Sequence, residues 1–282
     1  MAYPRMGTSC SVGTRIGKGL KFSMKQESFM FIFRKDHLLL KENPSSSFFS
    51  VAESTQLALP YIRQGSVGSP KGEGHFWGEV SEDTYPPAGA KFVSLRSLYD
   101  LLGERGFNVA GQAYQIMNWR RTTQFCASCG SVLREHVIDR ALECPVCHTI
   151  TYPPVTPVIA VAIEKDGHLL LARSPHFPPN RYSILAGFVE PGEQLEEAVA
   201  REVKEEVGLE IQDITYFGSQ PWPFPHTLMV GFTASWKAGN IQIDEKEIEA
   251  ADWYSPYSMP EIPPRASISR RLIDNYLEHT RD

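Results

Sequence analysis

The sequence predicts an α+β protein with three parts: an N-terminal mixed α+β domain, a small cysteine-rich module, and a C-terminal domain of strands and helices. Three observations support this prediction. The chain has 282 residues, which is enough for two domains with separate cores. Two close pairs of cysteines lie near its middle. Short apolar runs separated by turn residues lie on both sides of them. We expect the three parts to span 25–122, 123–152 and 153–282.

Composition excludes several classes of protein. An apolar content of 42% and a charged content of 22% are ordinary for a globular protein. The net charge of −5 argues against a dedicated duplex-DNA binder, which is usually basic. No apolar run approaches the roughly 20 residues that cross a bilayer, so we expect no membrane contact. Four of the five cysteines form close pairs, which indicates a metal site rather than a disulfide framework. We expect a cytoplasmic protein.

The first 25 residues contain five basic residues and no acidic one. They also lack the apolar core of a secretory signal. We therefore expect residues 1–24 to form a disordered extension, with a transit peptide as the alternative and Met24 as an alternative start. Cys10, within this segment, is expected to have no role in the site.

The N-terminal domain is predicted from short elements. The apolar runs 29–33 and 37–40 flank a charged turn and indicate a β-hairpin. His75, beside Trp77, is expected to be an ordinary surface or core histidine, and the domain contains no catalytic motif that we recognise. The other expected elements are a polar loop at 43–50, strands near 58–62 and 76–79, and helices at 93–102 and 109–122.

Two C-x-x-C pairs follow the second of these helices. Cys126 and Cys129 are separated by fourteen residues from Cys144 and Cys147. This spacing is typical of a zinc ribbon, in which four thiolates bind one Zn²⁺ tetrahedrally. Four protein ligands leave no open coordination position, so we expect one structural zinc per chain. The alternatives to a zinc site are free thiols or a redox pair. Within a zinc site, His148 is the possible substitute for one of the cysteine ligands.

A stiff, proline-rich linker at 152–157 begins the C-terminal domain. The run at 158–163, an Asp-Gly turn and the run at 168–172 indicate a second hairpin. Further strands are expected at 182–189, 227–235 and 249–254, and a final amphipathic helix at 267–278.

A helix is also expected from about Gln194 to Val207, because Leu195, Val199, Val203 and Val207 recur every four residues. Gly208 then occupies the C′ position that favours glycine.

The same helix contains a cluster of carboxylates. Glu202, Glu205 and Glu206 are three and four residues apart, so they lie together on one face. Neighbouring like charges repel, and a cation would remove that cost. Carboxylate oxygens are hard ligands that suit Mg²⁺ or Mn²⁺. The alternative is an acidic helix face that is simply solvated.

The segment from Gly187 to Leu209 has a recognisable pattern: Gly, five residues, Glu193, seven residues, then Arg201-Glu202-Val203-x-Glu205-Glu206-x-Gly208-Leu209. This pattern resembles the Nudix box at every defined position over 23 residues. The resemblance implies an α/β/α sandwich around a mixed sheet, with divalent metal bound by the helix. It also implies hydrolysis of nucleoside diphosphates linked to another group. A degenerate, non-catalytic Nudix domain is the alternative.

A second segment, Ser219 to Pro225, reads SQPWPFP. It resembles the signature of the NADH pyrophosphatase (NudC-type) branch of Nudix enzymes, with Thr227 where that branch usually has serine. Three prolines are expected to hold Trp222 and Phe224 on a rigid loop, where their rings could stack on a purine or nicotinamide. The alternative is a structural loop whose rings fill core.

This resemblance implies metal-dependent hydrolysis of the pyrophosphate bond of NAD(H) to nicotinamide mononucleotide and AMP. Glu206 is the expected main metal ligand and candidate base, assisted by Glu202 and Glu205, while Glu193 orients Arg201 or a ligand. The resemblance adds two metal ligands, Glu247 and the backbone carbonyl of Ala186.

The implied substrate contacts are Tyr152, which comes from the other subunit of a homodimer, Phe188, Gln220, Pro221, Trp222, Pro223, Phe224, Pro225, His226, Thr227 and Ser269. Removal of NAD caps from RNA would require cleavage of the same bond, and the sequence leaves it open. The competing interpretations are a Nudix hydrolase for ADP-ribose or dinucleoside polyphosphates, and a non-catalytic zinc-ribbon binding module.

Overall fold

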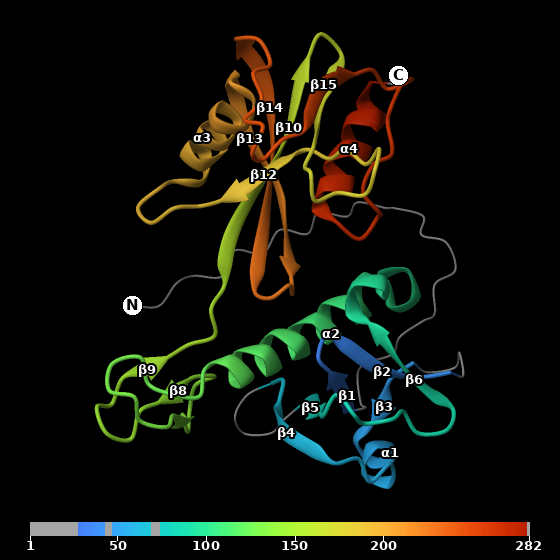
Figure 1. Cartoon of the computed structure of the whole chain (residues 1–282), viewed down its shortest axis with the longest axis vertical. Coiled ribbons are helices and arrows are strands. Elements are labelled where there is room, and N and C mark those ends of the chain that lie inside the picture. Colours follow the sequence, from blue (N-terminus) through green and yellow to red (C-terminus); the bar gives the residue numbers. More distant parts are fainter. Residues whose placement is uncertain (1–27, 43–46, 69–73, 281–282) are drawn as a thin grey trace, which may run out of the picture.

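The structure is a computed structural model that describes residues 28–42, 47–68 and 74–280. The extension predicted over 1–24, together with Cys10, lies outside the described residues. Two sheet-containing domains lie one above the other along the long axis of the molecule, and the cysteine-rich module lies beside the N-terminal one (Figure 1). The α+β class is confirmed, while the three domain boundaries stay a prediction. None of the described helices is long and apolar enough to cross a membrane.

The N-terminal domain contains a mixed sheet with the order β4-β5-β1-β2-β6, in which β3 also pairs with β1. The predicted hairpin is confirmed, because β1 and β2 pair in antiparallel fashion. The strand predicted near 76–79 is β5, and the one predicted near 58–62 begins only at position 61. The strands are β1 (Phe29–Arg34), β2 (His37–Lys41), β3 (Phe49–Ser50), β4 (Tyr61–Ser66), β5 (Phe76–Val80) and β6 (Ala90–Ser94).

The helices of this domain are α1 (Val51–Gln56), a 3-10 turn at Leu95–Ser97, and α2 (Tyr99–Thr122). The helix predicted at 93–102 was partly wrong. Val93 lies in β6 and pairs with Leu38 of β2, so sheet pairing overrides the local pattern. Of the loop predicted at 43–50, residues 43–46 lie outside the described residues, and the last two residues form β3 instead. Helix α1 was missed. The end of α2 before the first cysteine pair is confirmed.

The cysteine-rich module is a small three-stranded sheet with the order β7-β8-β9. Its strands are β7 (Arg134–Glu135), β8 (Leu142–Glu143) and β9 (Ile150–Thr151). It follows α2 directly in the chain and is here called the ribbon. It lies at the opposite end of the molecule from α3 (Figure 1).

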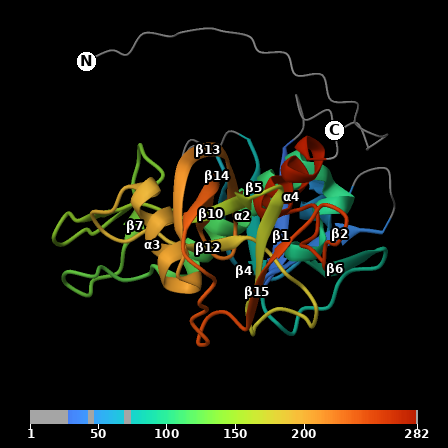
Figure 2. The ribbon, with the colours of Figure 1, turned by 90° about the horizontal axis from the view of Figure 1, so that it is seen from above.

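The C-terminal domain is an α/β/α sandwich. Its sheet has the order β13-β14-β10-β11-β15, with β12 paired to β10, and it is mixed because β10 and β14 are parallel. Helix α3 packs on one face of the sheet and α4 on the other (Figure 2). The elements are β10 (Thr156–Lys165), β11 (His168–Arg173), β12 (Leu185–Phe188), α3 (Leu195–Val207), β13 (Glu210–Trp222), β14 (Thr227–Ala238), β15 (Ala250–Tyr254) and α4 (Ile268–His279).

The strands predicted at 158–163, 168–172, 227–235 and 249–254 are confirmed, as are both helices. The strand predicted at 182–189 is shorter and forms β12. Strand β13 was missed. Its pairing with β14 has three register shifts, and Asp213 has a positive φ of 56°. Such irregularities disturb the alternation of apolar and polar residues by which a strand is recognised.

Candidate active site and metal centres

Helix α3 has well-defined ends. At its start, the side chain of Glu197 accepts a 2.9 Å hydrogen bond from the backbone N–H of Gln194, as in a capping box. At its end, Gly208 adopts the left-handed conformation with φ of 73°, as predicted. The apolar stripe is confirmed, because Val199, Val203 and Val207 are fully buried against the sheet. This packing fixes which face of the helix carries the carboxylates.

Arg201 organises the carboxylates around it. Its Nε and Nη2 donate to the two oxygens of Glu193 at 2.7 and 2.9 Å. Its Nη1 donates to Glu202 at 2.9 Å and to Glu205 at 3.1 Å. Nη2 also donates to the carbonyl oxygen of Phe188 on β12 at 2.9 Å. One guanidinium therefore ties α3 to β12 and to the loop between them. The hydrogen bonds that Glu193 accepts from Arg201 and from the backbone N–H of Glu190 lower its pKa to about 2.

Glu206 has no such partner. Its residue is only 7% exposed, and its Oε2 is buried without any hydrogen-bond donor. Burial, followed in order of size by the charges of Glu202, Glu247 and Glu205, raises its pKa to about 8. A buried acid without a counter-charge is costly to ionise, and a divalent cation would supply that charge. The donor set therefore fits the metal that the sequence predicted.

The glycine that begins the motif has a steric role. A Cβ at position 187 would lie 1.9 Å from the carboxyl carbon of Glu202. Only glycine lets that carboxylate lie directly against the backbone of β12. Burial raises the pKa of Glu202 as well, although Arg201 opposes the shift. Ala186, predicted to offer its carbonyl, is the preceding residue of β12, and its side chain is exposed.

Glu247 lies forty-one residues after Glu206 in the sequence but reaches the same cluster in space. The backbone N–H of Asp244 donates to the carbonyl of Glu206 at 3.0 Å, and that of Gln242 donates to the carbonyl of Val207 at 2.9 Å. These bonds dock the segment against the end of α3. The charge of Glu247 raises the pKa of both Glu202 and Glu206. The electrostatic coupling agrees with its predicted place beside the box.

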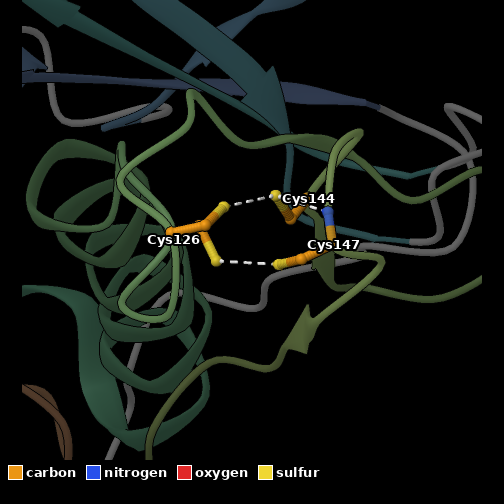
Figure 3. Close-up of side chains that lie close together, drawn as sticks. Cys126, Cys144 and Cys147 are labelled. Carbon is orange, nitrogen blue, oxygen red and sulfur yellow. Dashed lines mark hydrogen bonds between the residues drawn. The ribbon is translucent and has the colours of Figure 1, made fainter.

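The ribbon brings all four of its paired cysteines together. Among the described residues, only this group already gathers as metal ligands, with all four sulfur atoms within 4.8 Å of one another. Cys126 and Cys147 are 3.5 Å apart, and Cys129 and Cys144 are 3.4 Å apart. Figure 3 shows the sulfur atoms of the two pairs turned toward each other. Zn–S bonds of about 2.3 Å would place tetrahedral sulfurs about 3.8 Å apart, so the cluster is compatible with a zinc ribbon.

Each pair forms the same tight turn. The N–H of Gly130 donates to the carbonyl of Cys126 at 2.9 Å, and the N–H of His148 donates to that of Cys144 at 3.0 Å. Both donors have positive φ, 74° for Gly130 and 60° for His148. His148 is thus a turn residue, and its Nδ1 lies 3.4 Å from Glu143. It is not part of the cysteine cluster, so the substitute-ligand alternative was wrong.

Comparison with known proteins agrees with this geometry. Residues 153–276 match the NUDIX domain, and residues 27–119 match the NADH pyrophosphatase-like rudimentary NUDIX domain. A protein of Deinococcus radiodurans named NAD-capped RNA hydrolase NudC is 39% identical over 92% of this chain and 90% of its own length. The chain belongs to the Nudix family. Proteins of the same name from Stutzerimonas stutzeri and Pseudomonas aeruginosa are 42% and 43% identical, covering 79% and 78% of this chain and 80% and 78% of their own lengths. These matches assign the chain to the NudC-type branch.

In the Nudix domain, the SQPWPFP segment is only partly the rigid loop that the sequence predicted. Its first four residues complete β13, and the turn before β14 contains only 223–226. Gln220 is 6% exposed, and its Nε2 donates to the carbonyl of Ala266 at 2.7 Å. Its Oε1 is buried without a partner. Thr227, also buried, begins β14, and the Nδ1 of His226 lies 3.0 Å from the hydroxyl of Thr156.

The two rings of this segment contact the other domain. Trp222 lies 6.4 Å from Phe107, and Phe224 lies 6.2 Å from Tyr114, measured between ring centroids. Both partners belong to α2. The guanidinium of Arg96 lies 3.9 Å above the ring of Phe224. The rings thus pack against the N-terminal core, which is the structural alternative that the sequence left open. Base stacking by these rings stays a prediction.

The other predicted substrate residues lie in three places. Phe188 is 62% exposed at the end of β12, beside the Nudix box. Ser269 is half-buried in the first turn of α4. Tyr152 follows β9 of the ribbon, where its hydroxyl lies 3.4 Å from Asp139. Because the ribbon lies at the other end of the molecule from α3, Tyr152 does not join the Nudix box of its own chain (Figure 1).

Proposed function

We propose that the protein is a hydrolase that cleaves the pyrophosphate bond of NAD(H) and releases nicotinamide mononucleotide and AMP. The observation that carries this proposal is Glu206, a buried acid without a partner inside a complete Nudix box. The relatives named NAD-capped RNA hydrolase support the same bond as the target. We extend the proposal to NAD caps on RNA, because that reaction cleaves the same pyrophosphate.

The proposed metal ligands are Glu202, Glu206, Glu247 and the carbonyl of Ala186, with Glu205 close by. A Mg²⁺ or Mn²⁺ ion held there would neutralise charge on the pyrophosphate and lower the pKa of bound water. Arg201 holds Glu202 and Glu205 in position through its Nη1. Such preorganisation matters because misplacement of a reacting group by about 1 Å can cost about 100-fold in rate.

Glu206 is the proposed general base. Without a nearby positive charge it keeps its proton at neutral pH, because its pKa is about 8. The ionised, basic form of Glu206 therefore becomes available at neutral pH only when a positive charge lies beside it. Glu193 stays ionised at the same pH, since its pKa is about 2, and it holds Arg201. Neighbouring carboxylates of one motif thus take different roles because their surroundings differ.

We propose that the nicotinamide ring stacks on exposed Phe188, with Tyr152 supplied by the second subunit of a homodimer. The position of Tyr152, away from the box of its own chain, agrees with a contribution in trans (Figure 1). Sedimentation of the purified protein should give a dimer. Tyr152→Ala should raise the KM for NADH, and an unchanged KM would remove Tyr152 from the substrate site.

The direct test of the activity is product analysis. The protein is incubated with NADH, NAD⁺, ADP-ribose and NAD-capped RNA, with Mg²⁺ and Mn²⁺ compared. We expect nicotinamide mononucleotide and AMP from NADH, and no products with the Glu206→Gln variant. Cleavage of ADP-ribose with NAD(H) left intact would overturn the proposal in favour of a different Nudix substrate.

We propose that the four-cysteine site holds one structural zinc. Backbone N–H groups of Ser128 and Cys129 lower the pKa of Cys126, which favours the thiolate that a metal binds. Reduced cysteine ligands suit a cytoplasmic location. Elemental analysis should find one zinc per chain, and Cys126→Ser should remove it. Retention of full zinc by that variant would contradict the assignment.

A further inference from the structure

A cleft of about 490 Å³ lies between the N-terminal domain and the turn at 223–226. A volume of this size is within the range of small-molecule sites. One wall comes from the β1–β2 turn, the 3-10 turn and α2, and the other comes from the end of the SQPWPFP segment. The residues that matter for its chemistry are Lys35, Asp36, Arg96, Tyr114, Arg121 and Phe224.

Positive charge dominates this cleft. Lys35, Arg96 and Arg121 line it, against the single carboxylate of Asp36. The whole chain, by contrast, has a net charge of −5. A concave site with an excess of one sign of charge attracts a ligand of the opposite sign. The lining therefore favours an anionic ligand.

Arg96 is the cation of the cleft that is available to bind. Its side chain is exposed, and its guanidinium lies 3.9 Å from the centroid of the Phe224 ring. This contact holds the head group at the wall of the cleft. No carboxylate among the described residues pairs with Arg96, and no described oxygen accepts from its N–H groups. The fork of a guanidinium matches two oxygens of a phosphate group.

The other two cations are partly engaged. Lys35 pairs with Glu82 at 2.7 Å, but both side chains are mostly exposed. Such pairs contribute little, so the ammonium group can exchange Glu82 for a ligand. Arg121 donates to Glu79 at 3.3 Å and to Asn118 at 2.5 Å, so it adds charge more than free donors. Direct contacts to an anion therefore fall to Arg96 and Lys35.

The charged groups converge on one buried phenol. Tyr114 is 7% exposed. Burial raises its pKa, the charge of Arg121 lowers it, that of Asp36 raises it and that of Arg96 lowers it. Groups from three separate elements thus act on the same space. A carboxylate among cations suits a ligand that has hydroxyl donors beside its phosphate, as a ribonucleotide does.

The cleft lies beyond the SQPWPFP turn as seen from the Nudix box. Gly187 of β12 is level with Val230 of β14, because both pair with Ile159. Thr227, where the turn ends, is three residues from Val230, which is about 10 Å along the strand. The β13–β14 hairpin carries the turn toward α2 (Figure 1). A ligand that is held at the turn and extends past it would reach the cleft.

We propose that this cleft binds a phosphate of the RNA strand that follows an NAD cap. The excess of cations fits the phosphate, and the carboxylate of Asp36 fits a ribose hydroxyl. The inference rests on the proposed function for the direction of the strand, whereas the binding itself does not require hydrolysis. A free phosphate ion has part of the same chemistry, and the test separates the two sources.

The test is calorimetric titration of the full-length protein without added Mg²⁺ or Mn²⁺. The ligands are a four-nucleotide oligoadenylate and inorganic phosphate. Arg96→Ala should weaken binding of the oligoadenylate about tenfold. It should also make the slope of log affinity against log salt concentration shallower by about 0.7, the value for one phosphate contact on a single strand. Lys35→Ala should act in the same direction with a smaller change, because its side chain is exposed and already paired.

The matched control is Arg105→Ala. Arg105 is exposed on α2 and does not line the cleft, so the same loss of charge should leave the affinity within twofold and the slope unaltered. Equal binding of the oligoadenylate by the wild type and Arg96→Ala, with both folded by thermal melting, would overturn the proposal. An equal loss in Arg105→Ala would also overturn it, because only net charge would then matter.

An effect of Arg96→Ala on inorganic phosphate alone would overturn the RNA strand as the source and assign the cleft to a free anion. These titrations measure binding, so their result does not depend on whether NADH is cleaved. Failure here, with nicotinamide mononucleotide and AMP still released from NADH, would leave the proposed function intact.

Discussion

The two sheet domains have the same topology, but only the C-terminal one contains the Nudix box. In chain order, each has a hairpin, a short strand, a helix, a second hairpin, a last strand and a final helix. The sheet orders, β4-β5-β1-β2-β6 and β13-β14-β10-β11-β15, correspond strand for strand, with β3 and β12 in equivalent places. In both sheets only the pair β1–β5, or β10–β14, is parallel. The N-terminal domain therefore has the frame of a Nudix domain without its chemistry.

The difference lies in the helix after the short strand. Helix α1 has 6 residues, whereas α3 has 13. The one carboxylate of α1, Glu53, is fully used, because it accepts from Lys41 at 2.6 Å and from the N–H of Ser50 at 2.8 Å. These bonds lower its pKa, whereas burial raises that of Glu206. The two domains thus share a frame, but only the helix of the C-terminal domain leaves a buried carboxylate without a partner.

The N-terminal domain contacts the Nudix domain at the SQPWPFP segment. Helix α2 packs against Trp222 and Phe224 of the signature segment. Its Gly111 lies so close to the turn that a Cβ there would be 2.8 Å from Cγ of Pro223. The domain that lacks the catalytic helix therefore supports the turn beside the proposed substrate site.

The contrast between the two helices is tested most directly by replacing Glu206 of α3 and Glu53 of α1 with glutamine. We expect Glu206→Gln to lower kcat for NADH more than about 100-fold, a barrier increase of about 3 kcal/mol, because the candidate base is lost. Glu53→Gln, in the equivalent helix, should leave kcat within about twofold. Steady-state assays of both variants test this. Similar losses in the two would mean that the contrast between the helices is not the source of activity.

A smaller effect is expected from the glycine that lets Glu202 approach β12. Gly187→Ala should displace this carboxylate and lower kcat/KM about tenfold to 100-fold, with weaker activation by Mg²⁺. Gly218→Ala, in the same domain, is the control, because a Cβ there meets no atom within 4 Å. Metal titrations of activity measure both variants. Full activity of Gly187→Ala would show that Glu202 tolerates another position.

The support given by the N-terminal domain can be tested through Gly111→Ala. The added methyl group would press on Pro223, so we expect the KM for NADH to rise about fivefold while kcat changes less than twofold. Gln112→Ala changes an exposed neighbour on the same helix and should have no effect. If kcat fell and KM did not, the turn would act on the reaction itself rather than on substrate binding.

The smallest expected effect concerns stability and pH. In the cation-free protein, the folded pKa of Glu206 is about 8, above its usual value of 4.5. Between those values the folded state binds one proton more than the unfolded state, so this residue lowers stability as pH rises from 4.5 to 8. Glu206→Gln stays neutral and lacks this loss.

The measurement is the melting temperature of both proteins at pH 5 and pH 8. The difference in favour of Glu206→Gln should be larger at pH 8. Equal differences at the two pH values would mean that the buried carboxyl titrates normally. Glu193 should behave in the opposite way: its stabilising ionised form is lost only as pH falls from 4.5 toward 2.

Much of the C-terminal domain could be predicted because its signals are local. The apolar stripe of α3 follows the period of a helix, and the Asp-Gly turn indicates the hairpin at β10 and β11. Strand β13 escaped prediction because its bulges break the alternation. The correspondence of the two domains also escaped, since the N-terminal domain has the strand order of a Nudix domain but not its motif. Strand order depends on pairing between distant segments, which no single run of residues reveals.

Two centres, the four cysteines and the carboxylate helix, could be located from the residue spacing alone. Both are defined by short spacings, which local backbone geometry converts directly into proximity. Tertiary structure decided which groups are left without partners and which rings are already occupied. Glu206 has no hydrogen-bond partner for its Oε2, and the charge of Glu247 acts on it. The ring of Trp222 packs against Phe107 of α2. Burial and contacts between distant segments determine these outcomes, because charge and packing depend on all the atoms that surround a side chain.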